Sequence, residues 1–143
     1  MVHDFKRFPE LTNNQMTLYY WESPHKQITD NFHCQVVKVV DGDTVNVKWS
    51  ERDFTFPVRF ANTNAPEMSE GGEDAKRWMT DKLQGKNIEV RINPAKRVGK
   101  YGRILGNVIF GGMDVGEESI INGHATPFTN RDEGEIPNIK WVD

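Results

Sequence analysis

Four short stretches of the sequence gather polar side chains that have no evident structural task. They are Asp41-Gly-Asp-Thr, Arg59 within a Pro-Val-Arg-Phe run, Asn64-Ala-Pro-Glu and Lys100-Tyr-Gly-Arg. Hydrolysis of a phosphodiester needs a nucleophilic water, a base for its proton, and positive charge where the phosphorus centre gathers negative charge. Carboxylates that hold a divalent cation, a nearby glutamate and two arginines meet these needs. The combination therefore predicts phosphodiester chemistry.

Each stretch also has a plainer explanation when it is taken alone. Asp41 and Asp43 flank Gly42, and Asp-Gly pairs commonly form turns between strands. Arg59 alternates with apolar neighbours, so it is expected on the opposite face of its strand, where a solvated side chain is usual. Arg103 is compatible with a surface ion pair and Glu67 with an ordinary loop acid. The occurrence of all four stretches in one short chain favours the chemical interpretation.

The composition bounds the fold and the partners. With 143 residues and 36% hydrophobic content, the chain is long enough for one core and short for two full domains. The formal net charge is −3 and the sequence pI is about 5.8. The overall charge thus gives no general attraction to nucleic acid or to an anionic membrane, and any polyanion must be held by local features.

Cysteine content and hydropathy suggest the compartment. The single cysteine, Cys34, rules out an intramolecular disulfide, and its apolar surroundings predict a buried, inert thiol. The sequence has neither an apolar stretch approaching the roughly 18 residues of a membrane helix nor the apolar block of a signal peptide. We expect a soluble, intracellular protein, and a place in a larger particle stays open.

The hydrophobic periodicity predicts the elements that must position the polar residues. Apolar residues alternate over 36–40, 45–49, 54–60, 88–92 and 104–110, which predicts five strands. Helical spacing over 73–84, ended by Gly85, predicts an amphipathic helix between the third and fourth strands, and a short helix is expected over 117–121. This order predicts a mainly β protein with α-helices (α+β), built on a five-stranded OB-type barrel.

The chain divides into three parts by composition. Residues 1–30 form an N-terminal arm in which aromatic residues are scattered among polar ones. Residues 31–126 contain the barrel. Residues 127–143 are polar and acidic and predict an extended C-terminal tail.

The ordered series of motifs between about Val36 and Ala125 is more specific than any single motif. It runs VVDGDTV, VRF followed by an xPE triplet, a helix ending in LQGK, an IEV strand, KYGRILGNV and NGHA. This series resembles the thermonuclease family, the staphylococcal nuclease type. The resemblance implies a five-stranded OB barrel that cleaves DNA and RNA with calcium by metal-assisted attack of water.

The resemblance also implies a calcium site. By position, Asp43 corresponds to the first metal ligand, Asn64 stands where the family has a second carboxylate, and the carbonyl of Ala65 falls where the family offers a backbone ligand. Asp41 would support Asp43 from behind. Because an amide oxygen coordinates without contributing a full negative charge, we expect calcium binding weakened by Asn64.

The remaining roles carry over in the same way. Glu67 resembles the proposed general base, and Arg59 and Arg103 resemble the pair that grips the scissile phosphate. Lys100 and Tyr101 would reach a terminal phosphate of the nucleotide.

Two features near these residues remain open. Lys96, Arg97, Lys100 and Arg103 form a local basic cluster, which is either a phosphate track or a solvated loop. Phe128 is the only aromatic residue available near the end of the motif series, so base selectivity is not predicted.

Two functions follow from the sequence. The first is a calcium-dependent nuclease acting on DNA, RNA or both. The alternative is a catalytically weak or inactive OB-fold module that binds or supports a larger assembly. Asn64 and the aromatic arm motivate this alternative, because the arm offers apolar surface for docking onto a second copy or another protein.

Overall fold

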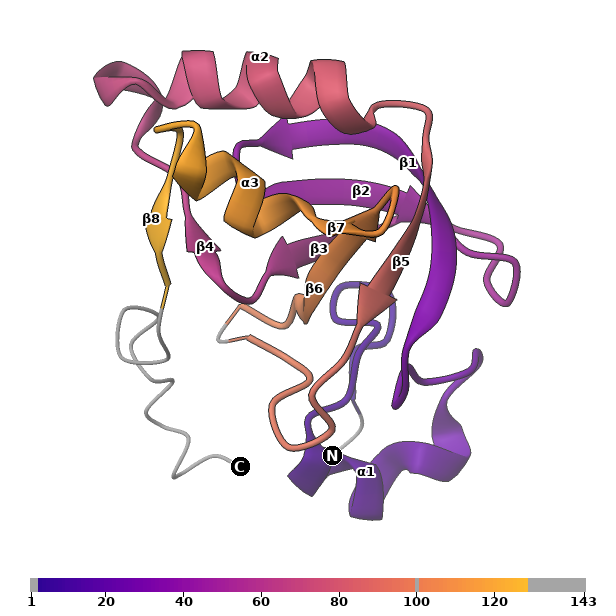
Figure 1. Ribbon diagram of the computed structural model, residues 1–143. Helices are drawn as coiled ribbons and strands as arrows, with labels where there is room; N and C mark the ends of the chain where they lie inside the picture. The colour runs from indigo at the N-terminus through magenta and orange to yellow at the C-terminus, as the bar shows by residue number, and fades with distance from the viewer. Residues whose placement is uncertain (1–2, 100, 129–143) are drawn as a thin grey trace.

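The computed structural model describes residues 3–99 and 101–128 (Figure 1). The predictions made for Lys100 and for the tail beyond Phe128 lie outside these residues. Within them, no helix is long and apolar enough to cross a membrane.

Five long strands form a closed barrel. They are β1 (Phe32–Asp41), β2 (Thr44–Lys48), β3 (Phe56–Phe60), β5 (Asn87–Arg91) and β6 (Ile104–Phe110). Their order is β3-β2-β1-β5-β6, and a parallel pairing between β3 and β6 closes the sheet on itself. Closure removes exposed strand edges. The predicted mainly β, five-stranded OB-type fold is confirmed.

Within the described residues, three two-residue strands complete the β structure. β7 (Met113–Asp114) pairs with β6 and extends the main sheet. β4 (Thr63–Asn64) and β8 (Thr126–Pro127) pair only with each other, on the left side of Figure 1. The β4–β8 pair fixes the segment around Asn64 against the end of the described chain.

Strand β1 shows how the sequence pattern builds the barrel. Its first half alternates strictly, with Phe32, Cys34 and Val36 buried. Its pairing with β2 then shifts register between Val36 and Lys38 and again between Val39 and Asp41. Irregularities of this kind bend a strand and increase its twist, which lets one strand pair with β5 at one end and β2 at the other. The second irregularity lies where β1 turns into β2, beside the predicted acidic residues.

Two helices pack against different strands of the barrel. α2 (Gly72–Leu83) buries Ala75, Met79 and Leu83, which are spaced four residues apart, and it lies along β1 (Figure 1). α3 (Val115–Ile121) begins at Asp114, whose carboxylate accepts a hydrogen bond from the Glu117 N–H. The two 3-10 turns, η1 (Tyr20–Glu22) and η2 (Met68–Glu70), are each three residues long.

The arm contains a helix that the sequence pattern did not predict. α1 (Asn13–Tyr19) starts with a capping box between Thr12 and Gln15, and it buries none of its residues. The arm is nevertheless packed on the barrel, because Leu11 and Ile28 on either side of the helix are buried. The division into arm, barrel domain and tail stays a prediction.

Both interpretations of Arg97, as part of a phosphate track and as part of a solvated loop, are wrong. Its side chain is 2% exposed and forms an ion pair with Glu10 of the arm, at 3.6 Å between Nη2 and Oε1. A buried arginine inside the fold is not available to a polyanion at the surface.

The burial of Cys34 leads to a prediction about thiol chemistry. Burial raises the pKa of the Cys34 thiol from its ordinary value of 9.0 to about 12. The native protein should therefore not react with Ellman's reagent at mildly alkaline pH, whereas the urea-unfolded protein should react fully. Rapid labelling of the native protein would contradict the burial of the β1 face on which Cys34 lies.

The same shift fixes the sign of a pH dependence. Below pH 9 the thiol is protonated in both states, so its contribution to the unfolding free energy is constant. As pH rises from 9 toward about 12, the thiol ionises only in the unfolded chain, so the stability falls. The unfolding free energy of the wild type minus that of Cys34→Val, measured in urea, should decrease over this range.

Candidate active site

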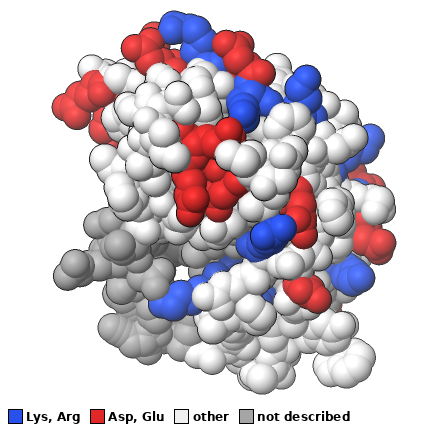
Figure 2. All heavy atoms as spheres, viewed as in Figure 1, with Lys and Arg blue, Asp and Glu red and all other residues white. Residues whose placement is uncertain are grey.

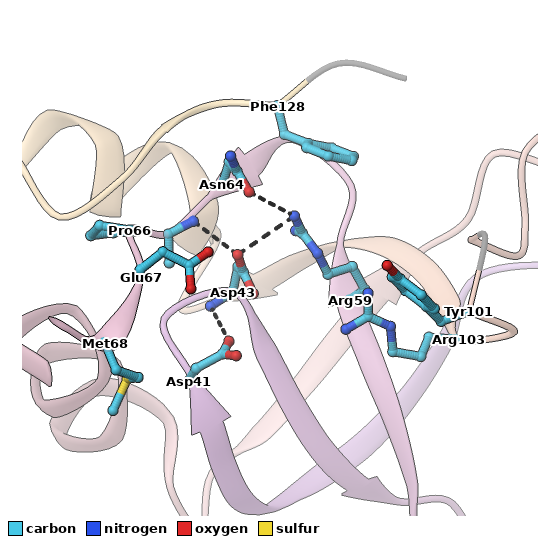
Figure 3. Close-up of a pocket in the computed structure, with 11 residues that line it drawn as sticks. Asp41, Asp43, Arg59, Asn64, Pro66, Glu67, Met68, Tyr101, Arg103 and Phe128 are labelled. Carbon is cyan, nitrogen blue, oxygen red and sulfur yellow. Dashed lines mark hydrogen bonds and ion pairs between the residues drawn. The ribbon is translucent and has the colours of Figure 1, made fainter. Parts of the chain in front are cut away.

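All the predicted site residues that the structure describes line one pocket, a cavity of about 400 Å³. Figure 3 shows the acidic side chains on one side of this pocket and the two arginines on the other. The lining comprises Asp41, Asp43, Arg59, Asn64, Ala65, Pro66, Glu67, Met68, Tyr101, Arg103 and Phe128. The structure thus brings together stretches that are widely separated in the sequence.

The barrel register explains this convergence. Arg59 on β3 lies opposite Thr44 of β2 on one side and opposite Leu105 of β6 on the other. Thr44 follows the turn that carries the two aspartates, and Leu105 follows Arg103 by two residues. Arg59 therefore lies between two segments: the acidic turn on the β2 side and the loop that carries Arg103 on the β6 side.

Asp43 is the most highly connected acid of the pocket. Its Oδ2 accepts a hydrogen bond from the Ala65 N–H at 2.8 Å and lies 3.5 Å from Nη2 of Arg59. Its Oδ1 accepts a hydrogen bond from the Thr44 hydroxyl at 3.1 Å. One buried carboxylate thus joins the β1–β2 turn, β3 and the segment after β4.

Asp41 lies behind Asp43 in the same turn. Its Oδ1 accepts a hydrogen bond from the Asp43 N–H at 3.0 Å. Burial, followed by a side-chain hydrogen bond with Asp43 and the negative charge of Asp43, raises the pKa of Asp41 to about 6, although the bond from the Asp43 N–H acts to lower it. Two carboxylates held this close create a site that favours positive charge.

Arg59 does not face bulk solvent, so the solvated alternative for this residue is wrong. It is 5% exposed, and its Nη1 donates to the carbonyl oxygens of Phe60 and Thr63, each at 2.7 Å. Its Nη2 donates to Oδ1 of Asn64 at 3.1 Å. The guanidinium is held in one orientation at the wall of the pocket.

Arg103 and Glu67 make fewer contacts than Arg59 and Asp43. The Nε of Arg103 is buried and has no hydrogen-bond partner among the described residues. The Tyr101 ring centre lies 5.3 Å from the Arg103 guanidinium carbon. Glu67 is exposed, and Figure 3 shows its carboxylate on the Asp43 side of the pocket. Because buried donors are normally satisfied, the Arg103 Nε indicates a place for an anionic acceptor.

The donor set of the pocket can be compared with the needs of a divalent cation. The described residues contain no group of three or more His, Cys, Asp or Glu side chains that could hold a metal ion. The oxygen atoms of Asp41 and Asp43 are nevertheless the hard ligands that calcium prefers, and their mutual repulsion is what a cation relieves. The side-chain oxygen of Asn64 already accepts from Arg59. The oxygen donors of the pocket therefore fit calcium in their chemistry, but the protein offers few of them.

Three lining residues were not among the predicted site residues. Phe128 places its ring 4.4 Å from the guanidinium carbon of Arg59, and Pro66 and Met68 line the opposite wall. Phe128 was noted in the sequence only as the one aromatic residue nearby, since its contact with Arg59 depends on the β4–β8 pairing. No local signal in the sequence distinguishes Met68 from other surface methionines.

The charges on the face shown in Figure 2 do not form one continuous basic surface. Lysine and arginine side chains are interspersed with acidic ones, and acidic side chains gather over α3. The start of α3 carries three acidic residues, Asp114 at the N-cap and Glu117 and Glu118 in the first turn. On this face a polyanion would have to be held at a local site rather than across a broad surface.

Comparisons with known proteins agree on one family. The model of the family described as staphylococcal nuclease homologue matches residues 57–140. An uncharacterized endonuclease of Escherichia coli is 36% identical over 100 residues, which cover 66% of this chain and 60% of that protein. The chain thus spans less than two thirds of that relative's length.

Two other relatives carry similar names. A protein named probable endonuclease from Komagataella phaffii is 27% identical over 161 aligned positions, covering 95% of this chain and 69% of that protein. A protein named micrococcal nuclease from Shigella flexneri is 34% identical over 79 residues, covering 54% of this chain and 42% of that protein.

The turn between the two aspartates generates a structural prediction. A Cβ added to Gly42 would lie 2.8 Å from the Cβ atoms of both Ala65 and Ala75. Gly42→Ala should therefore push the turn away from α2 and lower the unfolding free energy by about 1–3 kcal/mol, measured in urea. Lys38→Ala, at an exposed position of the preceding strand β1, serves as the control and should change stability little. Equal stability of Gly42→Ala and wild type would contradict this packing.

Proposed function

Since the chain belongs to the staphylococcal nuclease homologue family, we propose that it is a calcium-dependent nuclease that hydrolyses phosphodiester bonds of DNA, RNA or both. The observation that carries this proposal is the pocket in which Arg59 and Arg103 face Asp41, Asp43 and Glu67. A cavity with arginines on one side and carboxylates on the other suits a phosphate that is attacked by water.

The two arginines would bind the scissile phosphate. Arg59 is held by carbonyl oxygens and Asn64, so its orientation is set before substrate binds. Arg103 has a buried Nε that lacks a partner among the described residues and can donate to a phosphate oxygen. Charge-assisted hydrogen bonds from fixed donors stabilise the negative charge that develops in the transition state.

Glu67 would act as the general base. Its carboxylate would accept a proton from the water that attacks phosphorus, while the bond between phosphorus and the leaving oxygen breaks and that oxygen takes a proton from solvent. Its exposure lets the proton pass on to solvent. The position of Glu67 just before η2 fixes its backbone, because the Glu67 carbonyl accepts from the N–H groups of Glu70 and Gly72 at 2.8 and 2.9 Å.

Calcium would be held by Asp43, with Asp41 behind it and the Ala65 carbonyl as a backbone ligand. A calcium ion there supplies positive charge that polarises a phosphoryl oxygen and favours attack. Asn64 contributes no negative charge and already accepts from Arg59. We therefore propose that binding is weak and is strengthened when substrate supplies a phosphate oxygen.

The rim of the pocket would guide the substrate chain. Tyr101 is 64% exposed at this rim, and we propose that it contacts a terminal phosphate together with Lys100. Because the formal net charge is −3, attraction of nucleic acid depends on these few groups. Cleavage should accordingly weaken as salt concentration rises.

The alternative function is a binding or structural module with little turnover. Asn64 in place of a carboxylate favours it, as does the arm, on whose outer surface Leu18, Tyr20 and Trp21 are exposed. In this alternative the arm docks the protein onto a second copy or a larger assembly.

The first test of the nuclease proposal is cleavage of labelled single-stranded DNA across a calcium titration. Wild type should cleave, and chelator should stop the reaction. Arg59→Ala or Arg103→Ala should reduce kcat/KM by about 100- to 1,000-fold, because each removes a fixed donor to the transition state. Arg91→Ala, at an exposed arginine of β5 outside the pocket, should cleave like wild type. Intact DNA at every calcium concentration would refute the proposal.

The second test separates a weak calcium site from a lost one. Asn64→Asp adds a negative charge beside Asp43, so the calcium concentration for half-maximal cleavage should fall by about tenfold or more. The same variant should show a larger rise of Tm with calcium than wild type does. Asn46→Asp, which adds the same charge on β2 away from the pocket, should show neither effect. Absence of both effects, together with no cleavage by either protein, would favour the binding module.

A further inference from the structure

The loop between β5 and β6 carries Tyr101 and Arg103 to the pocket, and its other face is held by the N-terminal arm. None of the described arm residues lines the pocket itself. Contacts made by Arg97, Asn13 and Phe8 join the arm and the loop.

Arg97 anchors the beginning of the loop in the arm. Its Nε donates to the Ile28 carbonyl at 2.6 Å, and its Nη1 donates to the Leu11 carbonyl at 2.9 Å and to Oδ1 of Asn13 at 3.0 Å. Asn13 in turn donates from Nδ2 to the Pro94 carbonyl at 3.0 Å. A single guanidinium thus binds both ends of the arm segment that contains α1.

A buried acid compensates the charge of this anchor. Glu10 pairs with Arg97 and also with Arg52, and all three side chains are at most 2% exposed. Arg52 additionally lies against the Phe56 ring, with 4.5 Å between its guanidinium carbon and the ring centre. The cluster holds one negative and two positive charges, so removing Glu10 would leave two buried arginines without a counter-charge, and Glu10 of the arm is thereby held against the barrel.

Phe8 touches the loop beside the catalytic arginine. A Cβ placed on Gly102 would lie 3.0 Å from Cδ1 of Phe8, so the ring packs directly on the Gly102 backbone. Gly102 has φ +78°, a conformation that favours glycine and makes a sharp turn immediately before Arg103. The arm therefore supports the loop at the residue between Tyr101 and Arg103.

The backbone of the loop transmits this support. The Arg97 carbonyl accepts from the Leu105 N–H at 2.8 Å, and the Arg103 carbonyl accepts from the Gly99 N–H at 2.7 Å. The Gly102 N–H closes the tip by donating to the Gly99 carbonyl at 3.0 Å. A displacement at Arg97 or Gly102 must therefore displace Arg103.

We propose that the N-terminal arm positions Arg103 for its contact with the scissile phosphate, with Phe8 and Arg97 as the positioning residues. The inference rests on the proposed nuclease function and adds a role for a segment that lies outside the barrel. Arg97→Ala would leave Glu10 without one of its two partners and lower overall stability. Phe8, which is 38% exposed, is the more informative position to change.

The test compares wild type with Phe8→Ala, Phe8→Tyr and Leu18→Ala. Phe8→Ala should raise amide hydrogen exchange at Gly99 and Gly102 by about tenfold, with exchange in β1 and β5 unchanged. It should lower kcat for single-stranded DNA by about tenfold or more while KM changes by less than about threefold, because a misplaced arginine costs transition-state stabilisation. Phe8→Tyr keeps the ring and should restore both quantities.

Leu18→Ala is the matched control, since Leu18 lies on the same arm but is 69% exposed. It should change neither exchange nor kcat. Unchanged exchange at Gly99 and Gly102 in Phe8→Ala, or increased exchange with an unchanged kcat, would overturn the positioning role. A wild type that cleaves no DNA would instead refute the proposed function, and the exchange measurements would still decide whether the arm holds the loop.

Discussion

The parallel pairing of β3 with β6 is the constraint on which the candidate site depends. Without it, β3 would end the sheet, and Arg59 would have a partner strand on only one side. The pairing sets Leu105 opposite Arg59, which brings Arg103, two residues earlier, to the pocket. On the other side of β3, the pairing of Arg59 with Thr44 brings the adjacent Asp43 to the same pocket. Parallel pairing needs a long connection, and here that connection holds α2, β5 and the loop that the arm supports.

Asp43 and Asn64 contribute differently to the charge of the pocket: Asp43 is an acid, whereas Asn64 is a neutral acceptor for Arg59. Asp43 accepts hydrogen bonds from two segments and lies beside Arg59. The pKa of Asp41 is already raised to about 6, so a third carboxylate at position 64 would add repulsion whenever no cation is bound. The amide of Asn64 satisfies Arg59 without that repulsion. An amide at position 64 thus keeps a third negative charge out of the pocket when no cation is bound.

The sequence predicted the features that depend on local residue patterns. It did not predict features that depend on contacts between residues far apart in the chain or on helix capping alone. Alternation predicted the five long strands, and helical spacing predicted α2 and α3 to within two residues at each end. The polar stretches predicted which residues meet at the pocket. Arg97 was misread because a lysine–arginine loop looks solvated until the arm covers it. α1 was missed because it buries no residue and so has no apolar stripe, its start being fixed by a capping box alone.

Arg97 and Arg103 lie in the same loop and have different surroundings. Arg97 contacts the arm, whereas Arg103 lines the pocket. The Nε and Nη1 of Arg97 donate to carbonyls of the arm, and its Nη2 lies 3.6 Å from Oε1 of Glu10 without a hydrogen-bond partner among the described residues. Arg103, six residues later, keeps a buried Nε without a partner among the described residues. An unsatisfied donor destabilises a fold, so it persists only where the surrounding structure prevents the side chain from turning away. In our proposal, the contacts of Arg97 and Phe8 supply that restraint. Arg103 is then ordered when the protein folds, so substrate binding does not have to supply the free energy of ordering it.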